Sequence, residues 1–293
     1  MTPNTQGAFW MTVSMASFAA NDAVVKLITE EIPLFQFVFI RGLITTALMA
    51  ATAMAFGGLS LRIPRGDRGK VAWRTIFEIA AMVAFLTALV NMQLANATAI
   101  LAALPLSIAL GAALIFGEPI GWRRLTAILV GAVGVLMIIQ PGTDGFNAYA
   151  LIALLAVLFV TGRDLATRAF SSSVPSMGVA VITAFVVALA GGILSIWETW
   201  AAFSPRSLFL LALASVLIIG GYVCSILAMR VGEVAAVAPF RYTSLVCALL
   251  LGFVVFGEWP NELAFAGAGI VMATGLYTIL REHRLARRGG QEI

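Results

Sequence analysis

The chain has 293 residues, of which 61% are apolar and only 11% charged, and its mean hydropathy is +1.01. Soluble domains are about half apolar and about a quarter charged, so a soluble globular fold is excluded and lipid must surround most of the chain. The net charge of +4 does not indicate nucleic-acid binding, because most basic residues lie in short loops between apolar runs. Cys224 and Cys247 lie within apolar runs and form neither a disulfide framework nor a zinc motif.

A membrane-spanning helix needs about 20 mainly apolar residues. The sequence predicts ten such spans, at about 7–28, 34–56, 72–94, 97–116, 121–139, 148–167, 176–197, 207–229, 233–256 and 262–281. No basic segment precedes the first run and no cleavage site follows it, so it is predicted to be a retained helix rather than a signal peptide. We therefore expect an all-α integral membrane protein that ends in a short basic tail over 282–293.

Lysine and arginine residues are distributed unequally over the predicted loops. If the N-terminus is inside, Lys26 and Arg206 lie outside and Arg41 and Arg241 lie within spans. The remaining basic residues all lie inside: Arg62, Arg65, Arg68, Lys70, Arg74, Arg123, Arg124, Arg163, Arg168, Arg230, Arg281, Arg284, Arg287 and Arg288. Positive residues accumulate on the cytoplasmic side, so both termini are predicted to be cytoplasmic, in the inner membrane of a bacterial-type cell.

The two halves of the chain repeat each other. Phe116-Gly117-Glu118-Pro119 follows the fourth span and Phe256-Gly257-Glu258-Trp259 follows the ninth, at an offset of about 140 residues. Five spans per half is an odd number, so the second half must enter the membrane from the opposite side. The sequence therefore predicts an inverted repeat with five helices in 1–146 and five in 147–281, an arrangement typical of secondary transporters.

These features resemble the EamA-type branch of the drug/metabolite transporter superfamily, and within it the YddG-type amino-acid exporters. The resemblance extends over nearly the whole chain, and its residues are Asn96 to Leu101, Leu104-Pro105-Leu106, Gly117-Glu118-Pro119, Trp122-Arg123-Arg124, Ala238 to Tyr242 and Phe256-Gly257-Glu258. The sequence departs from the family around Ser244-Leu245, where a proline matching Pro105 often stands. The resemblance implies export of amino acids, aromatic or bulky apolar ones among them, or of related small metabolites by alternating access.

Polar side chains at membrane depth are costly, so they mark candidate sites. The predicted substrate pathway is formed by Glu78, Met82, Arg163, Tyr222, Ser225, Arg241 and Tyr242. Three of these residues have a simpler structural alternative. Glu78 can pair with Arg74 one helical turn earlier, Arg241 can extend to the interface, and Tyr222 can be a packing residue. Arg41, deep in the second span, must extend to the interface, pair, or line water.

The predicted gates are mirrored charged residues near the ends of spans one and six. They are Asn21, Asp22, Lys26, Asp164 and Arg168, and the two halves align here at an offset of about 142. The alternative is local pairing between residues four apart, Asp22 with Lys26 and Asp164 with Arg168. Pro105 is predicted to kink the fourth span. Glu118 and Glu258 are expected to favour the positive N-terminal dipole of the helix that follows each.

Other classes of function find no motif in the sequence. It has no phosphate-binding loop, and His283 in the basic tail is its one histidine, so ATP hydrolysis, metal binding and catalysis are not expected. An ion channel would need a ring of acids or a filter-like loop. We expect a cofactor-free carrier, monomeric. The alternatives are a drug, cation or other metabolite carrier of the same superfamily and, after it, an ion channel. Its partners are a small-molecule substrate and the lipid bilayer, without nucleic acid.

Overall fold

The computed structural model of the protein describes residues 2–55, 60–118, 121–143, 146–171, 173–232 and 234–289. Pro119, Glu233 at the start of the predicted ninth span, and residues 290–293 of the predicted tail lie outside these residues. The described residues form α-helices and short 3-10 turns, with no strand among them. The prediction of an all-α protein is confirmed.

The helices follow the predicted spans closely. In chain order they are α1 (Pro3–Ile28), α2 (Leu34–Ala55), η1 (Arg65–Asp67), α3 (Arg68–Asn91), α4 (Leu94–Leu101), α5 (Leu104–Phe116), α6 (Trp122–Ile139), α7 (Tyr149–Arg168), α8 (Ser176–Leu194), η2 (Ser195–Trp197), α9 (Pro205–Val231), α10 (Val234–Val237), η3 (Ala238–Tyr242), α11 (Thr243–Phe256) and α12 (Glu262–Gly289). The main difference in bounds is that α12 continues into the predicted tail.

Nine segments of the described chain are long and apolar enough to span a membrane, and they correspond to the second to tenth predicted spans. The remaining long helix, α1, has 26 residues but carries Asn21, Asp22 and Lys26. It packs in the interior, along α9 and against α11. The protein is therefore a multi-pass membrane protein. The polar residues of α1 are tolerated because this helix packs against other helices.

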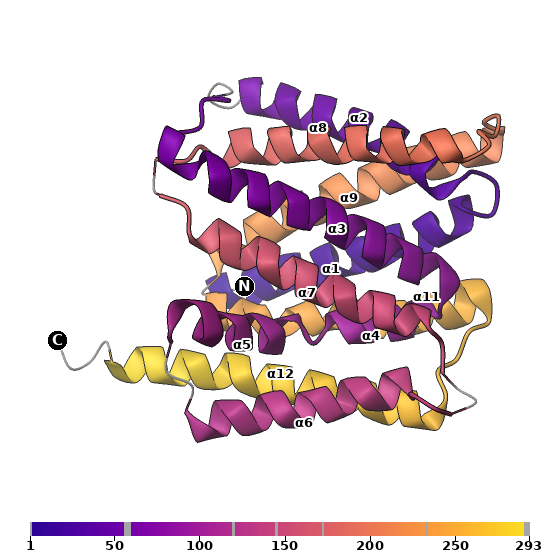
Figure 1. The fold of residues 1–293 in the computed structure, drawn as a ribbon. Coiled ribbons are helices and arrows are strands. Elements are labelled where there is room, and N and C mark those ends of the chain that lie inside the picture. Colours follow the sequence, from indigo (N-terminus) through magenta and orange to yellow (C-terminus); the bar gives the residue numbers. More distant parts are fainter. Residues whose placement is uncertain are drawn as a thin grey trace.

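Successive long helices run in opposite directions, so the bundle has two ends (Figure 1). α1 and α11 end at the right of Figure 1, which we call the Lys26 end. α5 and α7 end at the left, which we call the Arg168 end. α1 begins and α12 ends at the Arg168 end as well. The two described termini thus lie on the same side of the bundle.

The main helix contacts join the first half of the chain to the second. α1 packs along α9, α3 along α7, α2 along α8 and α6 along α12. Small residues permit the closest of these approaches. A Cβ added to Gly267 of α12 would lie 2.5 Å from the carbonyl oxygen of Gly134 on α6, so neither position tolerates a larger side chain without movement. Neither half could bury its helix faces without the other.

Two membrane segments are interrupted by a break in the helix. α4 ends at Leu101 and a new helix, α5, begins at Leu104, with Pro105 in its first turn. Proline lacks the N–H that a continuous helix would need and is well tolerated in a first turn. The second break is the short helix η3, which has Pro239 in its first turn. At the offset of 140 residues between the halves, Pro105 corresponds to Leu245, so Pro239 is a different proline and the departure from the family around Ser244-Leu245 remains.

The two breaks lie next to each other in the bundle. The hydroxyl of Tyr242, at the end of η3, lies 3.5 Å from the carbonyl oxygen of Ala102, within the break between α4 and α5. Tyr242 packs so closely on α12 that a Cβ on Gly275 would overlap its hydroxyl. Tyr242 is therefore buried at the junction of the two interrupted segments.

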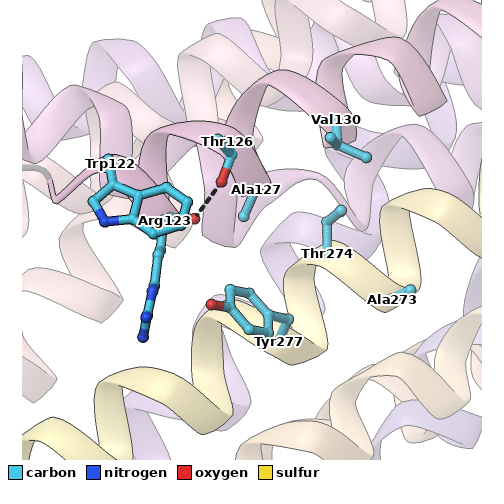
Figure 2. A pocket seen from close by; sticks show the side chains of 8 residues that line it. All are labelled: Trp122, Arg123, Thr126, Ala127, Val130, Ala273, Thr274 and Tyr277. Carbon is cyan, nitrogen blue, oxygen red and sulfur yellow. Dashed lines mark hydrogen bonds between the residues drawn. The ribbon is translucent and has the colours of Figure 1, made fainter.

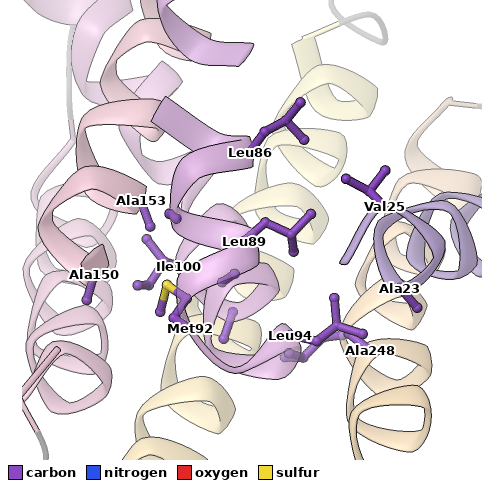
Figure 3. Close-up of a cluster of buried hydrophobic side chains, with 14 of the residues drawn as sticks. Ala23, Val25, Leu86, Leu89, Met92, Leu94, Ile100, Ala150, Ala153 and Ala248 are labelled. Carbon is purple, nitrogen blue, oxygen red and sulfur yellow. The ribbon is translucent and has the colours of Figure 1, made fainter. Parts of the chain in front are cut away.

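Apolar packing is concentrated at the Lys26 end. The large buried cluster in Figure 3 contains Val25 from α1, Leu89 from α3, Leu94 from α4 and Ala248 from α11. Toward the Arg168 end, the described residues form small separate clusters, such as the one around Met11. Because buried contact area stabilises an interface, the helices are held together more firmly at the Lys26 end.

Candidate functional site

A charged cluster joins α3 to α7 near the middle of the bundle. Glu78 lies about ten residues into α3, roughly 15 Å along the helix axis. Arg163 Nη1 donates to Glu78 Oε1 at 3.1 Å, and Arg163 Nε donates to Asp164 Oδ1 at 2.8 Å. Arg74 Nη2 lies 3.6 Å from Glu78 Oε2 on the other side. Two arginines from two helices thus compensate the Glu78 carboxylate at this depth.

Arg74 extends this cluster to α8. Its Nε donates to Thr167 Oγ1 at 3.1 Å and its Nη1 donates to Thr183 Oγ1 at 2.8 Å. The orientation count treated Arg74 and Arg163 as loop residues, but both lie inside helices and face other polar groups. These two arginines therefore should not be counted as loop residues in the argument for orientation. The remaining basic residues still lie mainly on the side that the sequence predicts to be cytoplasmic.

A second polar cluster lies between α1 and α2. Arg41 Nη1 donates to Asn21 Oδ1 at 3.1 Å, and Asn21 Nδ2 donates to Asp22 Oδ1 at 3.1 Å. The Arg41 guanidinium also lies over the Phe37 ring, 4.8 Å from its centroid. Of the alternatives open from the sequence, Arg41 thus pairs within the bundle. The chain Arg41–Asn21–Asp22 places one cation and one carboxylate side by side.

Tyr222 of α9 lies between the two clusters. Its ring meets Phe18 of α1 edge-on, with centroids 5.3 Å apart. The charges of Glu78, Arg163 and Arg41 act on its hydroxyl. Tyr222 is 54% exposed. Charged groups from three other helices lie within electrostatic range of it, so we infer that this exposed surface faces the interior of the bundle rather than lipid.

We call this set of side chains the polar centre. It contains three arginines, three carboxylates, one asparagine and one tyrosine: Arg41, Arg74, Arg163, Asp22, Glu78, Asp164, Asn21 and Tyr222. Formal charges of opposite sign are equal in number, so the formal net charge of the centre is zero. Such a centre can present both cationic and anionic groups to one ligand.

The other predicted pathway residues lie elsewhere. Met82, one turn after Glu78, packs against the large apolar cluster. Ser225 is partly buried on α9 near Tyr222, whereas Arg241 is exposed on η3. Tyr242 is buried and points to the helix breaks. The described contacts therefore do not bring Arg241 and Tyr242 into the polar centre.

The predicted gate cations form long-range pairs instead of the local pairs. Lys26 Nζ lies 2.5 Å from Glu258 Oε1 and donates to the Met92 carbonyl oxygen at 2.6 Å. Arg168 forms an ion pair with Glu118. Neither the Asp22–Lys26 pair nor the Asp164–Arg168 pair is formed among the described residues, because each cation extends away from its own helix.

Glu258 therefore has a different role from the expected one. Glu258 also accepts from the main-chain N–H of Leu94 at 3.0 Å, which is the start of α4 and not of the next helix, α12. The start of α12 is capped by Asn261, whose Oδ1 accepts from the Ala264 N–H at 2.8 Å. The sequence signal for the ion pairs was present in the shared offset of Phe-Gly-Glu and of Lys26 with Arg168. It did not indicate which residues face each other.

A separate groove of about 350 Å³ lies between α6 and α12 (Figure 2). Its walls are mainly apolar, and Arg123 lies over the Trp122 ring at 5.2 Å. Trp122 is 71% exposed, which is typical of aromatic residues at the membrane interface. The groove therefore lies on the outer surface and is not part of the polar centre.

The profile of the EamA-like transporter family matches the chain twice, over residues 5–140 and 147–281. The chain belongs to the EamA-like transporter family. It is therefore a membrane transporter. A crystal structure of a protein with 18% identity matches its fold with a TM-score of 0.66, covering 96% of this chain and 99% of that one.

Several named transporters are similar to this protein over almost their full length. The S-adenosylmethionine uptake transporter of Rickettsia prowazekii is 23% identical, over 95% of this chain and 94% of that one. The riboflavin transporter of Rhizobium johnstonii is 24% identical, over 96% and 93%. The pseudopaline exporter CntI of Pseudomonas aeruginosa is 26% identical, over 91% and 93%. Their names indicate small metabolites as the substrates of related proteins.

Proposed function

We propose that this protein is a secondary carrier that moves amino acids or amino-acid-derived metabolites across the membrane by alternating access. The observation that supports this most directly is the polar centre, where Glu78 and Arg163 pair at mid-depth among apolar helices, within electrostatic range of Tyr222. Ionisable groups at that depth are retained where they serve a substrate path. A carrier exposes such a centre to one side of the membrane at a time.

The proposed architecture is ten crossings in two inverted halves of five, 1–146 and 147–281. Helix ends recur at the offset of 140: α3 ends at Asn91 and α9 at Val231, while α5 ends at Phe116 and α11 at Phe256. The family profile also matches each half separately. The helix contacts support the same symmetry. The first helix of each half packs along the third helix of the other half, as the α1–α9 pair and the α3–α7 pair show.

The proposed orientation places the Arg168 end, with both termini, in the cytoplasm and the protein in the inner membrane. The basic residues outside the polar centre support it. The Lys26 end is then external. Since apolar packing is concentrated there, this structure corresponds to a carrier closed to the outside. A cytoplasmic substrate would enter from the less packed Arg168 end, in keeping with export.

The proposed substrate carries both a carboxylate and an ammonium group. An arginine such as Arg163 or Arg74 suits a carboxylate because its planar guanidinium donates two parallel hydrogen bonds. Asp22 and Glu78 suit an ammonium group. Tyr222, with Ser225 beside it, would contact the substrate body. S-adenosylmethionine, named for one group of relatives, is built on the amino acid methionine.

Flux into proteoliposomes tests this function. Purified protein is reconstituted without ATP, and uptake and efflux of radiolabelled S-adenosylmethionine, phenylalanine, leucine and riboflavin are followed. We expect saturable flux of at least one substrate with an amino-acid group, driven by its own gradient. Strict dependence on ATP, unsaturable ion flux, or transport restricted to riboflavin would contradict the proposal.

A further inference from the structure

The two Phe-Gly-Glu turns have the same backbone form. Gly117 and Gly257 both adopt the left-handed conformation, with φ of 68° and 64°. Glycine adopts it without the strain that a Cβ would cause, so each turn stops its helix abruptly. Each turn leaves a phenylalanine ring and a glutamate together at one end of the bundle.

Each turn holds a cation from the other half of the chain. Lys26 of the first half pairs with Glu258 and lies 5.1 Å from the Phe256 ring centroid. Arg168 of the second half pairs with Glu118 in the same way, and its guanidinium lies 5.4 Å from the ring centroid of the phenylalanine before Gly117. The two sites contain the same kinds of residue in equivalent positions, and they lie at opposite ends of the bundle. If these residues served only to end a helix, each glutamate would not need to pair with a cation from the other half of the chain.

The sites differ in what is attached to them. At the Lys26 end, the turn between α3 and α4 binds the pair through main-chain groups, because Lys26 donates to Met92 and Leu94 donates to Glu258. The side chains of this pair are 13% and 22% exposed. Those of Arg168 and Glu118 are 56% and 31% exposed. The more buried site is at the end with the large apolar cluster.

We propose that each Phe-Gly-Glu turn with its cation is a gate anchor, and that the gate closes when the adjacent helical turn docks its main chain onto the ion pair. This rests on the carrier function proposed above. In this structure the α3–α4 turn is docked on Lys26 and Glu258. Its counterpart after α9 begins at Gly232, which is extended like Met92 and lies 140 residues later. Gly232 docks on Arg168 when that end closes.

Labelling from one side of the membrane tests the anchor at the Lys26 end. In protein without Cys224 and Cys247, the reporter is Ile226→Cys, one turn after Tyr222 and 51% exposed. A charged methanethiosulfonate reagent is added to right-side-out and inside-out vesicles. We expect Glu258→Gln to raise the labelling rate from the Lys26 side at least about tenfold, which corresponds to about 1.4 kcal/mol in the gate equilibrium. Lys26→Gln should do the same.

Three controls separate gating from general damage. The exchange Lys26→Glu with Glu258→Lys should restore slow labelling. Glu31→Gln, which removes a partner of Arg206 at the same end, and Glu118→Gln, the same change in the other turn, should not raise it. Unchanged labelling in both Glu258→Gln and Lys26→Gln would overturn the anchor and leave the carrier intact. Absence of labelling from both sides in every variant would overturn the pathway itself, and the anchor with it.

Discussion

Arg163 and Glu78 are 85 positions apart in the chain, yet Nη1 of one lies 3.1 Å from Oε1 of the other. This contact connects α7 in the second half to α3 in the first. It occurs within electrostatic range of Tyr222, which is 54% exposed. The pair therefore joins the two halves at the proposed substrate pathway.

Neutralising either member of this pair should weaken substrate binding. We expect Glu78→Gln or Arg163→Gln to raise the half-saturating substrate concentration at least about tenfold, since hydrogen bonds to charged groups contribute about 1.5–3 kcal/mol. Proteoliposome flux with the transported substrate measures this. Glu262→Gln, at the exposed start of α12, is the matched control. An unchanged half-saturation value in both variants would remove the pair from the site.

The second to tenth predicted spans could be read from the sequence, because apolar runs of the required length are a local signal. The partners of the charged residues could not. The spacing of four residues favours an ion pair between Asp22 and Lys26, but the partner of Lys26 is Glu258 from the other half. The partners of Arg74 are also distant in the sequence, because Thr167 lies on α7 and Thr183 on α8. The sequence alone therefore favours a loop position for Arg74. Contacts between the halves depend on packing that no local pattern records.

The close approach of α6 and α12 predicts a position-specific effect on stability. Gly267→Ala should lower the free energy of unfolding by about 1–3 kcal/mol, because the added methyl overlaps Gly134. Gly269→Ala is the control on the same helix, where nothing lies within 4 Å, and it should be neutral or stabilising by up to about 1 kcal/mol. Thermal unfolding in detergent compares them. Equal effects at the two positions would contradict the packing described.

The distribution of basic residues predicts the topology. A reporter fused after Ile293 should be active in the cytoplasm, and one inserted after Gly142, between α6 and α7, should be external. Since α6 ends at the Lys26 end, the two reporters test the assignment of both ends. If both reporters were found on the same side, the two halves could not be inverted.

The central claim is that water and substrate reach the polar centre, and cysteine labelling on a single helix tests it most directly. In protein without Cys224 and Cys247, Tyr222→Cys is compared with Val216→Cys, which is 68% exposed on another face of α9. Thiols react with a charged reagent when they ionise in water, so a lipid-facing cysteine reacts slowly. We predict that Tyr222→Cys is labelled and is protected by transported substrate, while Val216→Cys is not labelled. Equal labelling at the two positions, or no protection of Tyr222→Cys, would contradict the account.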